Sequence, residues 1–88
     1  MDVKDFRYVI AVYETKSFSR AANILGTVQS NVSLRVRNVE RAYGVTLFER
    51  KYRHVAPTNH GETLYHHAKG VLALIDRAAQ AIASSRPA

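Results

Sequence analysis

The chain has 88 residues, with 13 Lys and Arg against 7 Asp and Glu, a formal net charge of +6, and no cysteine. The lack of cysteine excludes disulfides and cysteine-ligated zinc sites, and no apolar run approaches the length of a membrane span. This length suits one small domain, and the positive charge favours a polyanionic partner.

Helical spacing begins close to the N-terminus. The charged start lacks the apolar core of a signal peptide, so we expect a soluble, cytoplasmic protein. Apolar residues at spacings of three, four and three predict a core-packed helix from about Val3 to Thr15. These residues are Val3, Phe6, Ile10 and Tyr13. Ser17 or Ser19 can then cap a short second helix through residues 20–25, which carries Ala21, Ala22 and Leu25 on its apolar side.

A third helix is predicted by four valines at spacings of four, four and three, which match one helix face and not a strand. The valines are Val28, Val32, Val36 and Val39. Gly26 suits the end of the preceding helix, and Thr27 is expected to cap the new one, which should end at Gly44. The face opposite the valines is polar and basic, with one leucine. It comprises Ser30, Ser33, Leu34, Arg37 and Arg41, and Asn31 and Asn38 lie on its flank.

A small hairpin and a long helix complete the chain. Residues 45–50 and 53–58 are expected to form two short strands with a basic tip at Lys51 and Arg53, and Pro57 should end the hairpin. From residue 27 to residue 58 there are six basic and two acidic residues, so the positive charge is concentrated there. Thr58 opens a last helix of about 25 residues, with Glu62 near the capping-box position.

The last helix, at roughly 38 Å, is longer than so small a domain can cover with its own core. Half of its apolar stripe is therefore expected to pack on a second chain. The stripe consists of Leu64, Ala68, Val71, Ile75, Ala78 and Ile82.

Four segments of the chain resemble the N-terminal domain of LysR-type bacterial transcriptional regulators: SFSRAANIL, TVQSNVSLRVRNVE, YGVTLFER and PTNHGETLYHHA. The resemblance covers residues 2–83. It implies a mainly α fold, with a winged helix-turn-helix of three helices and a two-stranded wing over residues 1–58 and a long linker and dimerisation helix over residues 59–84. Residues 85–88 would be a flexible tail, and the family's effector-binding domain is absent from this stretch.

The resemblance implies sequence-specific binding to double-stranded DNA, with the third helix in the major groove and the wing in the minor groove. We expect a homodimer on an imperfect palindrome, with no cofactor. The resemblance also allows a tetramer in a full-length protein whose small-molecule effector binds the missing domain. The expected DNA-binding residues are Ser19, Arg20, Gln29, Ser30, Asn31, Ser33, Leu34, Arg37, Arg50, Lys51 and Arg53. The expected dimerisation residues are Leu64, Val71, Ile75 and Ile82.

Individual residues carry different expectations. The Gln29 amide can contact adenine, and an arginine at the tip, Arg53, can enter a narrow minor groove. Arg35 can touch a phosphate or pair with a neighbouring carboxylate. Many relatives carry a basic residue where Leu34 stands, and leucine suits a thymine methyl group, so sequence preference should differ from theirs. A small residue is frequent where Tyr52 stands, which leaves the tip conformation open.

Other classes of function fit the sequence less well. His60, His66 and His67 diverge around a helix, so one helix does not gather them around a metal ion, and we expect no metal. There is no nucleophile elbow and no glycine-rich phosphate loop, so we expect no catalysis. The alternative is a dimeric protein-interaction module with a basic surface and no specific DNA target. Such a module would tolerate loss of Gln29 and Arg53.

Overall fold

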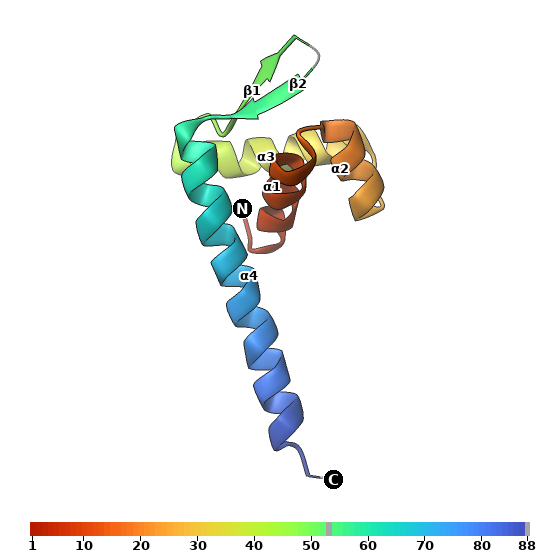
Figure 1. The fold of residues 1–88 in the computed structure, drawn as a ribbon, viewed down its shortest axis with the longest axis vertical. Coiled ribbons are helices and arrows are strands. Elements are labelled where there is room, and N and C mark those ends of the chain that lie inside the picture. Colours follow the sequence, from red (N-terminus) through yellow and green to blue (C-terminus); the bar gives the residue numbers. More distant parts are fainter. Residues whose placement is uncertain (53, 88) are drawn as a thin grey trace.

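The structure is a computed structural model that describes residues 1–52 and 54–87. Within these residues the chain forms α1 (Lys4–Thr15), α2 (Phe18–Leu25), α3 (Gln29–Tyr43), β1 (Phe48–Lys51), β2 (His54–Pro57) and α4 (Asn59–Ser85). In Figure 1, α1, α2 and α3 gather into one body, the hairpin rises above it, and α4 runs past α1 and out of the body as a stem. The molecule therefore extends 55 Å along its longest axis against 25 and 19 Å along the others. The predicted mainly α fold with a two-stranded wing is confirmed.

Local sequence signals set both ends of α2. Of the two serines proposed as the cap of α2, Ser17 takes the role, since its side chain accepts a hydrogen bond from the Arg20 N–H at 3.0 Å. Gly26 ends α2 in the left-handed conformation at a φ of 67°, as expected for glycine at this position. The short turn this allows brings α3 directly against α1 and α2.

The start of α3 differs from the prediction. The residue at the cap position is Val28, in an extended conformation and without a side-chain cap, so the prediction that Thr27 caps α3 was wrong. The Thr27 N–H instead bonds to the Ala22 carbonyl, which makes Thr27 part of the closure of α2. Its hydroxyl accepts from the Asn31 amide at 3.2 Å.

The valine stripe of α3 forms part of the core, with one exception. Val32, Val36 and Val39 are buried, whereas Val28 precedes the first helical turn and is 64% exposed. Val3 is also exposed, so the expectation that it packs in the core was wrong. Its position at the cap of α1 explains this, because the helical face begins only at the next residue. On α1 itself the core residues are Phe6, Val9, Ala11 and Val12.

The wing is a shorter hairpin than the sequence predicted. β1 and β2 pair in antiparallel register, with Phe48 opposite Pro57 and Lys51 opposite His54, so Pro57 is the last residue of the pairing. Residues 45–47 lie outside the strand because Leu47 is buried in the core and its backbone bonds elsewhere. The Leu47 N–H donates to the Glu40 carboxylate at 2.8 Å, and its carbonyl accepts from the Thr58 N–H at 2.9 Å.

The start of α4 is fixed tightly beneath the wing. The Thr58 side chain accepts from the Gly61 N–H at 3.1 Å and donates to the Thr46 carbonyl at 2.6 Å. A side chain at Gly61 would collide with the Leu47 carbonyl, so only glycine permits this approach. Glu62 does not complete a capping box; its carboxylate accepts from the Tyr13 hydroxyl on α1. The helix has 27 residues and ends at Ser85, which the sequence had assigned to the tail.

Candidate nucleic-acid interface

The first turns of α3 present a polar face next to the start of α2. Gln29 and Ser30 are exposed, Ser33 is half-buried, and Leu34 is 48% exposed, so the expected base-reading residues do share one accessible face. The Ser19 hydroxyl donates to the Gln29 side-chain carbonyl at 3.1 Å. This bond orients the Gln29 amide and joins the first turns of α2 and α3. The Arg20 side chain is exposed beside them.

Asn31 lies apart from this face. It is half-buried, and its amide nitrogen donates to the Thr27 hydroxyl at 3.2 Å and to the Tyr8 hydroxyl at 3.4 Å. The first bond ties the start of α3 to the turn before it, and the second ties it to α1. The arrangement gives Asn31 a part in holding α3, in addition to the DNA contact proposed for it from sequence.

The two arginines in the middle of α3 have different surroundings. Arg35 pairs with Asp5, which is buried, at 3.1 Å between Nη1 and Oδ1, so the carboxylate alternative considered for Arg35 is the one the structure shows. Its guanidinium also lies 5.7 Å from the Tyr8 ring. Arg37 is exposed, one turn or more along the face that carries Ser33. Of these two arginines, Arg37 is therefore the one that remains a candidate for the phosphate contact expected from the sequence.

The wing is connected to α3 through Arg50. Its guanidinium stacks 4.2 Å above the Phe18 ring, and Nη2 donates to the Ser33 hydroxyl at 3.4 Å. Lys51 pairs with Glu49 at 3.0 Å, with both side chains about half exposed. Arg53, the arginine expected at the tip, lies outside the described residues. Arg50 thus joins the two elements expected to meet the two grooves.

A cleft of about 290 Å³ lies between α2, α3 and the wing. Its lining includes Ser19, Gln29, Arg50 and Lys51, which the sequence had selected, and Lys16 and His54, which it had not. Lys16 immediately precedes the cap of α2, and His54 is the first residue of β2. Their closeness in the chain to residues already selected is the sequence signal that could have identified them. The lining brings these two further titratable groups close to the polar end of α3.

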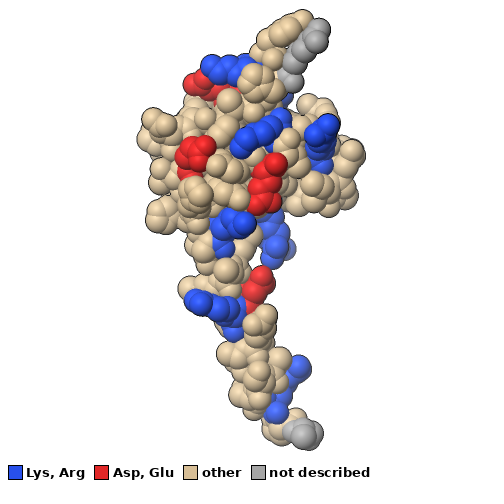
Figure 2. Space-filling model, viewed as in Figure 1, with Lys and Arg blue, Asp and Glu red and all other residues tan. Residues whose placement is uncertain are grey.

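A second exposed surface lies on the stem. Leu64 packs against the core of its own chain and Ala68 is fully buried, but beyond them the stripe is exposed. Four large apolar residues lie within about 100° of one another on this helix face, and Leu74 among them was missed by the sequence analysis. They are Val71 (37% exposed), Leu74 (62%), Ile75 (46%) and Ile82 (65%). Figure 2 shows basic and acidic side chains along the stem as well, separated by stretches of uncharged surface.

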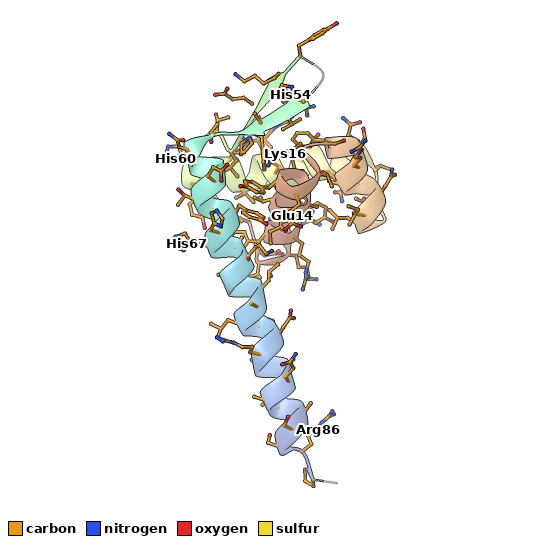
Figure 3. The ribbon with its side chains drawn as sticks, viewed as in Figure 1. Glu14, Lys16, His54, His60, His67 and Arg86 are labelled. Carbon is orange, nitrogen blue, oxygen red and sulfur yellow. The ribbon has the colours of Figure 1, made fainter. Side chains whose placement is uncertain are left out.

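The histidines do not form a metal centre among residues 1–52 and 54–87, where no three His, Cys, Asp or Glu side chains gather closely enough to share an ion. In Figure 3, His60 and His67 project from the side of α4 opposite to α1. They line an apolar hollow with Tyr43 and Leu47. Across the described part of the chain, no helix is long and apolar enough to cross a membrane.

Comparison with known proteins agrees with this geometry. The family model for bacterial regulatory helix-turn-helix proteins of the lysR family matches residues 3–62. The transcriptional regulator IlvR of Caulobacter vibrioides is 41% identical over 76 residues, which are 86% of this chain and 26% of that protein. BudR of Raoultella terrigena is 40% identical over 78 residues, which are 89% of this chain and 27% of that protein. The chain spans about a quarter of the length of these curated relatives.

Two similar solved structures contain DNA. The BenM DNA-binding domain in complex with catB site 1 DNA has a TM-score of 0.92 and 31% identity, and each chain is covered completely. The CbnR DNA-binding domain in complex with DNA has a TM-score of 0.90 and 29% identity, with 98% of this chain and 100% of that chain covered. The chain belongs to the lysR family of bacterial regulatory helix-turn-helix proteins, and it comprises the DNA-binding helix-turn-helix domain of that family.

Proposed function

We propose that the chain binds double-stranded DNA as a homodimer and recognises an imperfect palindrome, in the bacterial cytoplasm. The observation that carries the proposal is the connection of the exposed face of α3 to the wing, through the bond from Arg50 to Ser33. A helix fits the major groove, and a basic hairpin beside it can follow the backbone into the minor groove. Gln29, Ser30, Ser33 and Leu34 then read base edges.

Phosphate contacts account for most of the affinity in such complexes. Candidates for these contacts are Ser19, Arg20, Arg37, Arg50, Lys51 and Arg53. Replacing Arg53 with alanine is expected to weaken binding to most sequences and to flatten its dependence on salt, because the loss of a phosphate contact is independent of base sequence. The relatives with DNA in their structures, BenM and CbnR, support DNA as the partner.

The stem supports the homodimer. Its exposed apolar strip, formed by Val71, Leu74, Ile75 and Ile82, continues beyond the part of α4 that the body covers. A two-fold axis across this strip would pair it with the same strip of a second copy. The two recognition helices would then lie on half-sites separated by one or more helical turns.

The complete protein is proposed to be a transcriptional regulator that acts by binding and not by catalysis. Its curated relatives are regulators more than three times as long as this chain, so their remaining length can hold an effector-binding domain and the contacts of a tetramer. Residues 1–58 would then be the DNA-binding unit and residues 59–84 the linker and dimerisation helix.

Selection from a random pool of duplexes, at near-physiological salt and with the mass of the chain recorded in solution, tests the proposal. We expect enrichment of a two-fold motif bound by a dimer. Enrichment of no motif, with binding that depends only on salt, would contradict sequence-specific recognition and would favour the interaction module.

Replacing Gln29 with alanine is expected to relax the preference at one base position of the selected motif. A good bidentate amide contact contributes about 1 to 3 kcal/mol of discrimination, so the preferred base should lose roughly tenfold or more of its advantage there. Competition binding with single-base variants of the motif measures this. Gln80→Ala, the same substitution at an exposed glutamine of the stem, is the control and should leave every position unchanged.

A further inference from the structure

Besides the packing of Leu64 and Ala68 on the core, two sets of polar contacts attach the stem to the body. The first lies at the N-terminus of the stem, where Thr58 bonds to Thr46 and Leu47 and where Gly61 approaches the Leu47 carbonyl. A helix held at one end can still pivot about that end. A second attachment, further along its axis, fixes its direction.

The second attachment is a set of four side chains that we name the α1–α4 clamp: Tyr13 and Glu14 of α1, and Glu62 and Tyr65 of α4. The rings of Tyr13 and Tyr65 stack with centroids 3.6 Å apart and planes at 11°. The Tyr13 hydroxyl donates to Glu62 at 2.6 Å, and the Tyr65 hydroxyl donates to Glu14 at 2.6 Å. The bonds therefore cross, because each helix supplies one donor and one acceptor.

Basic side chains surround the clamp. Lys16 lies 3.6 Å from the centroid of the Tyr13 ring, and Lys69 lies 3.4 Å from the Glu14 carboxylate. Figure 3 shows Glu14 and Lys16 at the end of α1 that adjoins α4. The Lys69 ammonium balances the Glu14 carboxylate while Glu14 keeps its hydrogen bond from Tyr65.

Both tyrosines remain donors over the physiological pH range. The hydrogen bond to Glu62 is the main reason that the pKa of Tyr13 is raised to about 12. The bond to Glu14 raises the pKa of Tyr65, and the same bond, aided by Lys69, lowers the pKa of Glu14 below its usual range. The donors stay protonated and this acceptor stays ionised.

The clamp contributes little to the stability of the fold. The side chains of Glu14 and Glu62 are each 47% exposed, and hydrogen bonds and ion pairs open to water are weak contributors. The buried contacts of Ala68 and Gly61 hold α4 on the body without them. What the clamp adds is direction, since two crossed bonds and a stack resist both tilt and rotation of α4 against α1.

A small change in the angle between α4 and the body has a large effect at the far end of the stem. From Tyr65 to Ile82 the helix advances by roughly 25 Å, so a tilt of about 10° at the clamp displaces Ile82 by roughly 4 Å. The rise of one base pair is about 3.4 Å. In a dimer joined along the stem, the stem is fixed and the same tilt moves the body, with α3, about the clamp. Because both copies tilt, the two recognition helices shift relative to each other by a distance of the order of one base pair.

We propose that the α1–α4 clamp sets the half-site separation that the dimer accepts. Tyr13 and Tyr65 act as specificity-determining residues without touching DNA, because they fix the angle between α4 and the body that carries α3. This inference rests on the dimeric DNA binding proposed above. The two tests below distinguish failure of the inference from failure of that DNA binding.

The first test measures binding to duplexes that carry two copies of the selected half-site, with the separation varied in steps of one base pair. For the parent chain, one added base pair is expected to weaken binding by about tenfold or more. For the double variant Tyr13→Phe and Tyr65→Phe, which keeps the stack but loses both hydroxyls, the loss should be about threefold or less. Tyr43→Phe, at a half-exposed tyrosine outside the clamp, should behave like the parent.

The second test needs no DNA. Because the chain has no cysteine, spin labels can be placed uniquely at Asn23→Cys on α2 and Gln80→Cys on the stem. In a mixture with excess unlabelled chain, the distance distribution should be narrow in the parent and clearly broader in the double tyrosine variant. A variant that keeps both the narrow distribution and the sharp separation profile would overturn the inference alone. A parent indifferent to separation would overturn the inference together with the proposed dimeric recognition.

Discussion

Replacing Ile75 with glutamate is expected to convert the chain into a monomer and to weaken binding to a complete palindrome by about 100-fold or more. Ile75 is 46% exposed and lies near the middle of the apolar strip of α4. Across a two-fold axis the substitution places two carboxylates in an apolar contact, where unpaired charge is strongly unfavourable. Affinity for a single half-site should change less than threefold, because the face of α3 is untouched.

Analytical ultracentrifugation together with binding to full and half operators measures this result. Gln80→Glu introduces the same carboxylate on the opposite side of the stem, and it should remain dimeric with parent affinity. If the Ile75→Glu chain still sediments as a dimer, the apolar strip is not the dimer interface. A monomer that binds the full operator as tightly as the parent would show that dimerisation contributes nothing to recognition.

The elements of this fold could be predicted because each has its own periodic signal. The valines of α3 recur with the period of a helix, and Gly26 and Gly44 end their helices in the left-handed conformation that glycine favours. The cap of α3 was the error, since a threonine before a helix satisfies the general preference whether it caps that helix or closes the one before it. Only the bond from the Thr27 N–H to Ala22 distinguishes the two roles.

The contacts that organise the candidate site could not be predicted in the same way. Asp5 and Arg35 are 30 residues apart, and Tyr65 and Glu14 are 51 apart. Neither pair lies on one element, so no local spacing relates its members. Leu74 was missed for a different reason, because the stripe was read at spacings that pass through Val71 and Ile75, whereas the exposed face is wide enough to include Leu74.

The two central arginines of α3 are expected to respond in opposite ways to alanine substitution. Arg35→Ala leaves the Asp5 carboxylate, whose side chain is 3% exposed, with the Asp2 N–H as its hydrogen-bond donor at 3.1 Å. Breaking a fully buried pair costs about 3 to 5 kcal/mol, and Arg35 is 39% exposed, so we expect the free energy of unfolding to fall by about 2 kcal/mol. Chemical denaturation measures this. Arg37→Ala should change it by less than about 0.5 kcal/mol, since Arg37 is exposed.

Binding should show the reverse order. Arg37→Ala is expected to weaken binding to all sequences alike and to lower the salt slope by about one, because one phosphate contact is lost, while folded Arg35→Ala keeps the parent slope. Adding Asp5→Asn to Arg35→Ala should recover part of the lost stability, since the buried charge is then removed. A lower salt slope for Arg35→Ala would mean that Arg35 contacts DNA. No recovery of stability in the double variant would mean that the pairing of Arg35 with Asp5 is not what holds α1 against α3.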